Sequence, residues 1–536
     1  MNLDKSLYEI LLQTTNIYPK NYAICFENKL ITYQKLLKEV DKLAEFLHEM
    51  NVKEKDIVTV SMPNMPMSII SLYAINKLGA ICYEIHPKTP CNLMREYMKK
   101  VNSKILLVIN VFAEKYISLI EELDIKIITF NPFYQNNALM RLVCNIKSPK
   151  EKVIRYEKVK EKDTKLSLVK WNIEDTAILL NTGGTTGSSK IVEISTKAIN
   201  ALASTGVSIL GIKDPQNSYM LGVLPLFHGF GLCMGVHSPI MYGACISLMM
   251  KFNVSKTIKL IKHDRLTIII GVPTLYKLLL KNKKFYNKKL QNLTASYVGG
   301  DAVPEKLIHD YNEALEKYGS SSRLYEGYGL TETVTVCAVN TKEQNCHLSV
   351  GKAVPGAVIK IVDPQTHEFL VNGKLGEIVV SGDILMNGYF KDNDATNKIM
   401  LIKDGVKYLL TGDYGYLNDD NYLFFKQRLK RIVKVSGNII CPSDVENVVS
   451  KLNGIHEVYA TSMPHEIRGQ MIKLFVVKDK NINITEEELN KNIKQAIMDN
   501  ISIYALPKKI VYLDSFPKTE IGKIDGKRIE KENPDA

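Results

Sequence analysis

The sequence predicts an α/β protein with a large N-terminal domain and a small C-terminal α+β domain. Three observations lead to this fold class. The chain has 536 residues, of which 45% are hydrophobic and 24% charged, as in globular proteins of more than one domain. Helical and extended patterns alternate along residues 1–130, and the C-terminal part of the chain carries the pattern of a second, compact unit.

The N-terminal domain is expected to contain a helix capped by Thr32, followed by parallel strands. Apolar residues recur at helical spacing after this cap, at Leu36, Val40, Leu43, Ala44 and Leu47. Short apolar runs rich in β-branched residues predict strands at residues 57–61, 80–85, 104–110 and 125–130. Because three of the gaps between these runs can hold a helix, we expect a parallel sheet covered on both faces.

A segment without Asp, Glu, Lys or Arg covers residues 216–250 and is long enough to cross a bilayer. Pro225, His228, His237 and Pro239 interrupt it, together with several glycines. Such interruptions suit buried strands and a short helix. We therefore expect core and pocket wall here, and no membrane span.

The C-terminal unit is expected to hold two helices and three strands. Pro442 suits the first position of a helix that Gly454 ends, and Thr485 with Glu488 forms a capping box for a second helix. Apolar runs predict strands at residues 458–463, 472–477 and 510–513. The charged segment 427–434 before them is the expected domain boundary.

The charge and cysteine content exclude some classes of protein. Sixty-one lysines and nine arginines outnumber the 57 acidic residues, which leaves a net charge of +13. The lysines are dispersed and are not interleaved with aromatic residues, which favours a solvated surface over nucleic-acid binding. The nine cysteines form no C-x-x-C pair, and Asp4 and Glu9 break the apolar stretch that a signal peptide needs. We therefore expect a cytoplasmic protein with reduced thiols.

The most informative stretch is LNTGGTTGSSKIV, at residues 180–192. Glycines allow backbone N–H groups to turn toward an anion, hydroxyl groups add donors and Lys190 adds a positive charge, so this loop predicts phosphate binding. It is not a Walker A loop, because Ser189 precedes Lys190 and Ile191 follows it, where that motif has Gly and Ser or Thr.

Seven further motifs follow this loop in order. They are LPLFHGFG (224–231), VGGDAVP (298–304), EGYGLTET (326–333), GKLGEIVVSGDILMNGYF (373–390), LTGDYGYL (410–417), KQRLKRIVKVSGNIICPSDVE (426–446) and FPKTEIGKID (516–525). With the loop, they resemble the acyl-adenylate-forming enzymes: the acyl- and aryl-CoA synthetases, the adenylation domains of peptide synthetases and the luciferases. The resemblance covers residues 20–528 and depends on the ordered set, since each motif alone is weak.

The resemblance implies the adenylate-forming fold. Residues 1–427 would form an N-terminal domain of stacked α/β sheets that binds the nucleotide and the acid. Residues 428–536 would form a mobile C-terminal domain with its hinge near Lys430. Swinging of this domain would remove Lys523 from the site and bring in the loop at Gly437, which would let a pantetheine arm pass close to the backbone.

The resemblance also implies an ATP site with Mg²⁺. Its expected ATP-binding residues are Thr182, Gly183, Gly184, Thr185, Thr186, Gly187, Lys190, Gly299, Gly300, Asp301, Tyr328, Gly329, Asp413 and Arg428. The expected catalytic residues are Lys523, Thr331 and Glu332, with Glu332 as the Mg²⁺ ligand. Lys523 would bridge the substrate carboxylate and the α-phosphate. Such a site would act by positioning and by electrostatic stabilisation of the charge that grows on the α-phosphoryl group.

The sequence departs from the family pattern in two places. In the phosphate loop, Ser189 stands where Pro is typical and Ile191 where Gly is typical, and a Thr-His pair is replaced by Thr196 and Lys197. Near the hinge, Arg431 occupies a position where an acid is common. These changes put loop rigidity and domain alternation in question more than the chemistry.

The implied reaction activates a small carboxylic acid with ATP and transfers the acyl group to CoA. Amino-acid-activating relatives hold the substrate ammonium with Asp after Phe, whereas this chain has His228 after Phe227. An uncharged pocket favours a fatty, other acyl or aryl acid, because burying an unpaired ammonium is costly. The candidate pocket residues are His228, His237, Gly300, Tyr325 and Gly327.

Two alternatives stay open. The acceptor could be the phosphopantetheine of a separate carrier protein, whose acidic surface would suit a lysine-rich face. The chain could also be a catalytically silent nucleotide-binding relative, although Glu332, Asp413, Arg428 and Lys523 are all present.

Overall fold

The computed structural model describes residues 3–133, 142–145, 149, 151–159, 166–182, 190–212, 214–436, 438–518 and 524–534. They fall into two compact units. The first unit comprises Met1–Ile359 and Val380–Leu409, and the second comprises Lys360–Val379 and Leu410–Ala536. We predicted a domain boundary between residues 427 and 428, with a hinge near Lys430. Both the boundary and the hinge remain predictions.

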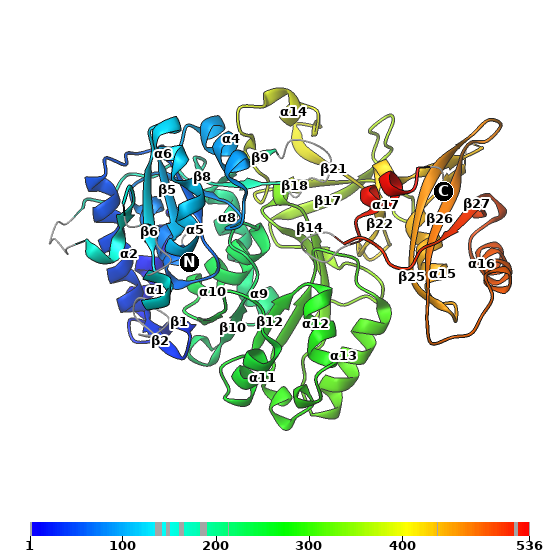
Figure 1. Cartoon of the computed structure of the whole chain (residues 1–536), viewed down its shortest axis with the longest axis horizontal. Coiled ribbons are helices and arrows are strands. Elements are labelled where there is room, and N and C mark those ends of the chain that lie inside the picture. Colours follow the sequence, from blue (N-terminus) through cyan, green and yellow to red (C-terminus); the bar gives the residue numbers. More distant parts are fainter. Residues whose placement is uncertain are drawn as a thin grey trace. The chain divides into compact units, whose positions relative to one another are not determined.

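The first unit contains a nine-stranded and an eight-stranded sheet, both largely parallel (Figure 1). The nine-stranded sheet has the order β16 (Lys352–Ala353), β15 (Val336–Val339), β14 (Leu324–Gly329), β13 (Ala295–Val298), β12 (Ile268–Gly271), β10 (Tyr219–Gly222), β11 (Cys245–Leu248), β1 (Tyr22–Phe26), β2 (Lys29–Thr32). The eight-stranded sheet has the order β19 (Gly388–Tyr389), β9 (Ile191–Ser195), β8 (Thr176–Asn181), β4 (Ile81–Glu84), β3 (Ile57–Ser61), β5 (Ile105–Ile109), β6 (Lys126–Phe130), β7 (Ile154–Arg155).

Helices surround these sheets. They are α1 (Leu7–Ile17), α2 (Tyr33–Glu49), α3 (Pro66–Lys77), α4 (Cys91–Val101), α5 (Asn110–Ala113), α6 (Ser118–Leu123), α8 (Thr196–Ala203), α9 (Gly206–Leu210), α10 (Ser238–Met241), α11 (Val254–Lys262), α12 (Pro273–Leu280), α13 (Glu305–Lys317) and α14 (Asn393–Asn397). The predicted N-terminal helix is confirmed as α2, where the Thr32 side chain accepts from the Lys35 N–H. The four predicted strands are confirmed as β3 to β6 and pair in parallel.

The packing of α12 and α13 explains why two motifs lie at the edge of the nine-stranded sheet. Leu275 and Tyr276 of α12 and Tyr311 of α13 join one buried cluster with Val298 and Leu324 of the strands. The helices therefore hold β13 and β14 in place. VGGDAVP and GLTET begin where these strands end, at the edge where ligands of parallel sheets commonly bind.

The charge-free segment 216–250 forms β10, the π-helical η4 (Phe230–His237), α10 and β11, and nearly all of its apolar residues are buried. Across the described parts of the chain, we find no helix with both the length and the apolar character that a membrane crossing requires. All nine cysteines are free thiols, as predicted.

The second unit contributes most of two smaller sheets. One has the order β17 (Ala357–Val362), β18 (Gly376–Gly382), β21 (Val406–Leu417), β20 (Met400–Lys403), with β22 (Leu423–Arg428) paired to β21. The other has the order β24 (Asn438–Ile440), β23 (Val433–Val435), β26 (Gly469–Lys478), β25 (Ile455–His465), with β27 (Pro507–Tyr512) paired to β26. Its helices are α15 (Pro442–Val449), α16 (Glu486–Asn500) and α17 (Gly526–Glu532).

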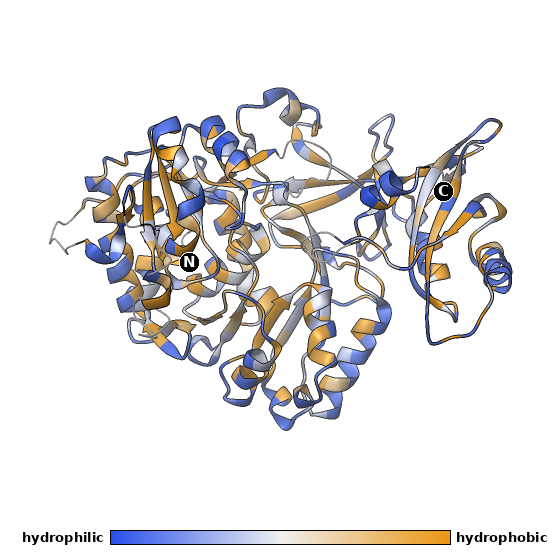
Figure 2. Ribbon diagram, in the orientation of Figure 1, coloured by the Kyte–Doolittle hydropathy of each residue, from blue (hydrophilic) through white to orange (hydrophobic). Residues whose placement is uncertain are grey.

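The predicted C-terminal elements are present, with one difference in length. Pro442 is the first residue of α15, and Thr485 caps α16 by accepting from the Glu488 N–H. Gly454 does not end α15, which stops at Val449; Gly454 has a φ of +93° in the turn that leads into β25. Figure 2 shows apolar strands in this unit and a polar outer side on α16.

Candidate active site

The predicted phosphate loop is closed at its base by two hydrogen bonds. The Thr182 N–H donates to the Lys190 carbonyl at 2.9 Å, and the Lys190 N–H donates to Thr182 Oγ1 at 3.2 Å. Antiparallel pairing of β8 with β9 brings these two residues together. The loop residues Gly183, Gly184, Thr185, Thr186, Gly187 and Ser189 lie outside the described residues.

A contact chain connects Lys190 with Glu332 through Tyr389. The Lys190 ammonium lies 4.3 Å from the centre of the Tyr389 ring, and the Tyr389 hydroxyl donates to Glu332 Oε1 at 2.8 Å. Pairing of β19 with β9 places Tyr389 opposite Val192, next to the loop. The structure therefore brings the phosphate-loop lysine and the expected Mg²⁺ ligand to one place.

Tyr389 is a site residue that sequence reasoning missed. It lies in the motif GKLGEIVVSGDILMNGYF, which contributes to the family resemblance but predicts no function for this tyrosine. Burial, and after it the Glu332 carboxylate, raises the pKa of the Tyr389 hydroxyl above the ordinary phenol value. The hydroxyl therefore stays protonated and is available as a donor to Glu332.

The backbone around Glu332 is also fixed. The Met386 N–H donates to the Glu332 carbonyl at 2.9 Å. Thr333 Oγ1 donates to the Leu330 carbonyl at 3.0 Å and holds the turn closed on the other side. Thr331 and Glu332 keep partly exposed side chains within this rigid frame.

Two predicted glycines come into close contact where β13 and β14 end. A Cβ added to Gly299 would lie 3.0 Å from the Gly327 carbonyl oxygen, so these backbones meet without side chains between them. Gly300 has a φ of +80°, a conformation that favours glycine. Asp301 follows with an exposed side chain. Tyr328 and Gly329 are the last two residues of β14, the strand that neighbours β13.

Three of the predicted pocket residues lie close to this edge. His228 is exposed, and the preceding Phe227 packs edge-on against His86 with ring centres 4.8 Å apart. Tyr325 is buried and packs on Tyr297 with ring centres 5.6 Å apart. Gly327 is the point of close approach to Gly299 described above.

His237 lies in the core and not at the predicted pocket wall. Its side chain is fully buried, Nδ1 is 2.9 Å from the Tyr73 hydroxyl and Nε2 is 2.9 Å from Asn200 Oδ1. Burial lowers the pKa of this imidazole to about 3, so the ring is neutral. Both ring nitrogens are therefore used in packing, a role that a histidine in an apolar run does not reveal from sequence.

In the second unit, Asp413 and Arg428 form an ion pair. They face each other in the register of β21 and β22, and Arg428 Nε is 2.8 Å from Asp413 Oδ1. Asp413 is almost fully buried, whereas most of the Arg428 side chain remains exposed. The Asp413 N–H donates to Thr411 Oγ1, which itself donates to the Ile378 carbonyl.

Arg431 and Lys197, which depart from the family pattern, both form ion pairs. Arg431 donates to Glu446 Oε1 at 2.6 Å and to the Ala460 carbonyl at 3.1 Å, which ties the segment after β22 to α15. Burial raises the pKa of Glu446 despite the opposing effect of Arg431. Lys197 pairs with Glu174 and Asp383, each at 3.1 Å.

Gly437 and Lys523 lie outside the described residues, as does the side chain of Lys430.

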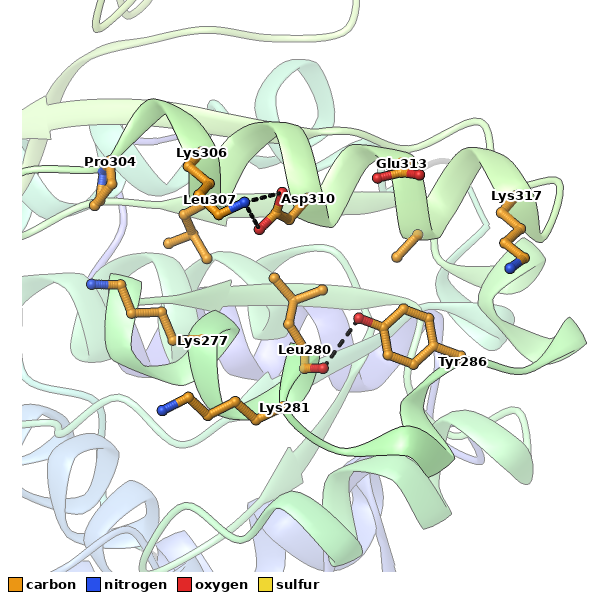
Figure 3. A pocket seen from close by; sticks show the side chains of 11 residues that line it. Lys277, Leu280, Lys281, Tyr286, Pro304, Lys306, Leu307, Asp310, Glu313 and Lys317 are labelled. Atoms are coloured by element: carbon orange, nitrogen blue, oxygen red, sulfur yellow. Dashed lines mark hydrogen bonds and ion pairs between the residues drawn. The ribbon is translucent and has the colours of Figure 1, made fainter. Parts of the chain in front are cut away.

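A hollow of about 540 Å³ between α12 and α13 contains none of the predicted site residues (Figure 3). Its walls are formed by Lys277, Leu280, Lys281, Tyr286, Pro304, Lys306, Leu307, Asp310, Glu313, Ala314 and Lys317. Lys306 and Asp310 pair across one helical turn within it. We do not assign this surface hollow to the acid or to the nucleotide.

The chain matches known families over most of its length. Residues 12–390 match the family described as AMP-binding enzyme, and residues 444–523 match the AMP-binding enzyme C-terminal domain. A long-chain-fatty-acid–CoA ligase from Bacillus subtilis is 28% identical over 550 residues, covering 99% of this chain and 95% of the relative. The 4-coumarate–CoA ligase CCL1 from Humulus lupulus is 28% identical and covers 94% and 92% of the two chains.

Solved structures agree with the fold. The crystal structure of ATP-bound MatB from Rhodopseudomonas palustris has a TM-score of 0.85 at 20% identity, covering 100% of this chain and 99% of that one. The predicted fold class, a large α/β domain with a smaller C-terminal domain, is confirmed.

Proposed function

Because this chain belongs to the family of AMP-binding enzymes, we propose that it is an AMP-forming acid–thiol ligase that converts a fatty or aryl acid to its CoA thioester. The observation that carries the proposal is the contact chain from Lys190 through Tyr389 to Glu332. It joins a cation beside the phosphate loop to a carboxylate that can face a metal ion. This pair of charges suits a reaction between two anions, ATP and a carboxylate.

The reaction proceeds in two half-reactions. A carboxylate oxygen of the acid attacks the α-phosphorus of ATP, the bond to the bridging oxygen of pyrophosphate breaks, and acyl-AMP forms. The thiolate of CoA then attacks the acyl carbon, and AMP leaves with the electrons of the acyl–oxygen bond. Neither half-reaction needs a nucleophile from the protein, so the side chains act by positioning and by stabilising charge.

The described residues fit these tasks. Lys190 and Thr182 lie at the base of the phosphate loop, where they would contact the β- and γ-phosphates. Asp413 and Arg428 would hold the ribose hydroxyls, because a carboxylate accepts two hydrogen bonds at once. Thr331 would contact phosphate. Lys523, which lies outside the described residues, would bridge the acid and the α-phosphate.

Glu332 fits a Mg²⁺ ion that is bound mainly by phosphate and water. Tyr389 occupies Oε1 of Glu332, and its donation orients the carboxylate. Within the described ranges, no three His, Cys, Asp or Glu side chains form a ligand set. Mg²⁺ commonly binds one or two carboxylates together with substrate phosphates, and it would neutralise phosphate charge here.

The proposed class of acid is based on the residue types at the predicted pocket positions. His228 replaces the Asp that would bind an amino acid, and the rings nearby belong to Phe227, His86, Tyr297 and Tyr325. The relatives named above act on long-chain fatty acids and on 4-coumarate. We therefore favour an apolar acyl or aryl carboxylate, with CoA as the acceptor.

The test is pyrophosphate release against acids graded by chain length and aromaticity, with CoA present and absent. We expect release that depends on one of these acids, and thioester formation only with CoA. Thioester formation only on a phosphopantetheine carrier protein would replace the acceptor. Failure of the whole panel, with amino acids included, would favour a silent nucleotide-binding relative.

The proposed role of Lys523 gives a second test. Lys523→Ala should reduce acid-dependent pyrophosphate release by about 10²- to 10³-fold, the scale of one lost transition-state donor. Thioester formation from supplied acyl-AMP should largely survive. Lys527→Ala, four residues further on in α17, is the matched control and should leave both rates unchanged. Equal loss of both half-reactions in Lys523→Ala would contradict the assignment.

A further inference from the structure

The segment directly after Glu332 has an unusual backbone. Val334 has a φ of 61° and a ψ of −57°, and the Thr335 N–H donates to the Thr333 carbonyl at 2.6 Å across it. This geometry is a γ-turn with positive φ, which is rare and strained. A β-branched residue is among the least suited to positive φ, because its side chain crowds the backbone.

Two neighbouring backbone segments approach the turn so closely that only glycine fits there. A Cβ added to Gly229 would lie 1.7 Å from the Val334 carbonyl oxygen, and one added to Gly329 would lie 1.6 Å from the Thr335 carbonyl oxygen. Val334 itself is fully buried. The motifs LPLFHGFG and EGYGLTET therefore meet at this turn, and both supply a glycine against its carbonyl groups.

Both ends of the turn are also fixed. Upstream, the Thr333 hydroxyl bonds Leu330 and the Glu332 carbonyl accepts from Met386. Downstream, β15 pairs with β14, with Val336 opposite Gly329. Strained backbone persists when the surrounding structure over-determines it, and it concentrates at functional sites.

We infer that Val334 is a positioning residue whose strained turn fixes the Glu332 carboxylate for Mg²⁺ and nucleotide. The inference rests on the proposed function. Glu332 lies two residues before Val334 and accepts from the Tyr389 hydroxyl at 2.8 Å. A change of backbone direction at Val334 would therefore displace the carboxylate from Tyr389. Displacement of a catalytic group by about 1 Å can lower a rate by orders of magnitude.

The experiment compares Val334→Ala with Val334→Gly. Both variants remove the branched side chain, but only Gly removes the Cβ that makes positive φ unfavourable. Val108 in β5 is equally buried and is not among the positive-φ residues, so Val108→Ala and Val108→Gly form the control pair. The melting temperature of Val334→Gly should be about 1 to 3 °C higher than that of Val334→Ala. The melting temperature of Val108→Gly should be lower than that of Val108→Ala.

The functional readout does not depend on the identity of the acid. Binding of α,β-methylene-ATP is measured by calorimetry with and without Mg²⁺. We expect Mg²⁺ to tighten binding to the wild type and to Val334→Ala, and this tightening to fall at least about fivefold in Val334→Gly. With an acid identified, kcat for pyrophosphate release should fall about tenfold in Val334→Gly, while KM for the acid stays within about twofold.

The outcomes separate the inference from the proposed function. A Val334→Gly variant that is less stable than Val334→Ala would overturn the strain, and an unchanged effect of Mg²⁺ in a more stable Val334→Gly would overturn the positioning role. If the wild type binds the analogue but activates no acid, the proposed reaction fails while the calorimetric comparison still decides this inference. If the wild type does not bind the analogue, both fail.

Discussion

Two carboxylates with expected roles in nucleotide binding, Glu332 and Asp413, are held in opposite ways. Asp413 lies within a hairpin, where the register of β21 and β22 places Arg428 beside it at 2.8 Å. Glu332 lies beside a strained turn at Val334 and depends on Tyr389 for its orientation. A hairpin can orient a side chain through ordinary strand geometry. Where β13 and β14 end, backbone strain and close contacts with glycines orient Glu332 instead.

Removing the charge of Glu332 is expected to have the largest effect. Glu332→Gln keeps an oxygen for the Tyr389 hydroxyl but loses the negative charge that would bind Mg²⁺. Acid-dependent pyrophosphate release should fall by about 10²- to 10³-fold, with little change in melting temperature. Glu316→Gln, at an exposed position of α13, is the control. A loss below about threefold would remove Glu332 from the catalytic set.

Asp413→Asn should have a smaller effect of a different kind. Asn keeps one acceptor for the ribose but loses the ion pair with Arg428. KM for ATP should rise about tenfold, about the cost of one charge-assisted hydrogen bond, while kcat changes little. Steady-state kinetics at varied ATP concentration separates the two parameters. A fall in kcat as large as that of Glu332→Gln would show that the two carboxylates do not differ in role.

Much of the fold was predictable because it follows local rules. Thr32, Pro442 and Thr485 mark helix starts through capping and fixed φ, and β-branched runs mark β3 to β6. The end of α15 was misjudged because Gly454 looks like a helix stop, although the helix had already ended at Val449.

The site was less predictable, for physical reasons. Lys190, Tyr389 and Glu332 come from three separate segments. The pairing of β19 with β9 and the hydrogen bonds from Met386 and Tyr389 to Glu332 bring them together. A valine gives no signal for positive φ, so the turn at Val334 has no signature in the sequence. His237 lies in an apolar run whether it faces a ligand or the core, and its bonds to Tyr73 and Asn200 decide for the core.

Tyr389→Phe should lower the rate of pyrophosphate release modestly, because Tyr389 orients Glu332. The variant removes the donor to Glu332 Oε1 but keeps the ring beside Lys190. We expect kcat for pyrophosphate release to fall about three- to tenfold, in keeping with the loss of one hydrogen bond to a charged group. Tyr408→Phe, a buried tyrosine of β21, is the control. No change in kcat would mean that the strained turn alone orients Glu332.

Glu84 offers a third carboxyl group, and here the expected effect is on stability alone. It is 1% exposed at the end of β4, its Oε1 accepts from the Cys82 thiol at 3.6 Å, and among the described residues nothing bonds its Oε2. Burial raises the pKa of this carboxyl to about 8. The folded protein therefore keeps a proton that the unfolded chain releases near pH 4.5, and stability from this group falls as the pH rises from about 5 to 8.

Glu84→Gln should remove this pH dependence. Measured by denaturant unfolding across this range, the variant should match the wild type near pH 5 and gain on it by up to about 1.4 kcal/mol per pH unit toward pH 8. Glu96→Gln, at an exposed site on α4, should run parallel to the wild type. Parallel curves for Glu84→Gln and the wild type would mean that Glu84 is ionised in the folded protein.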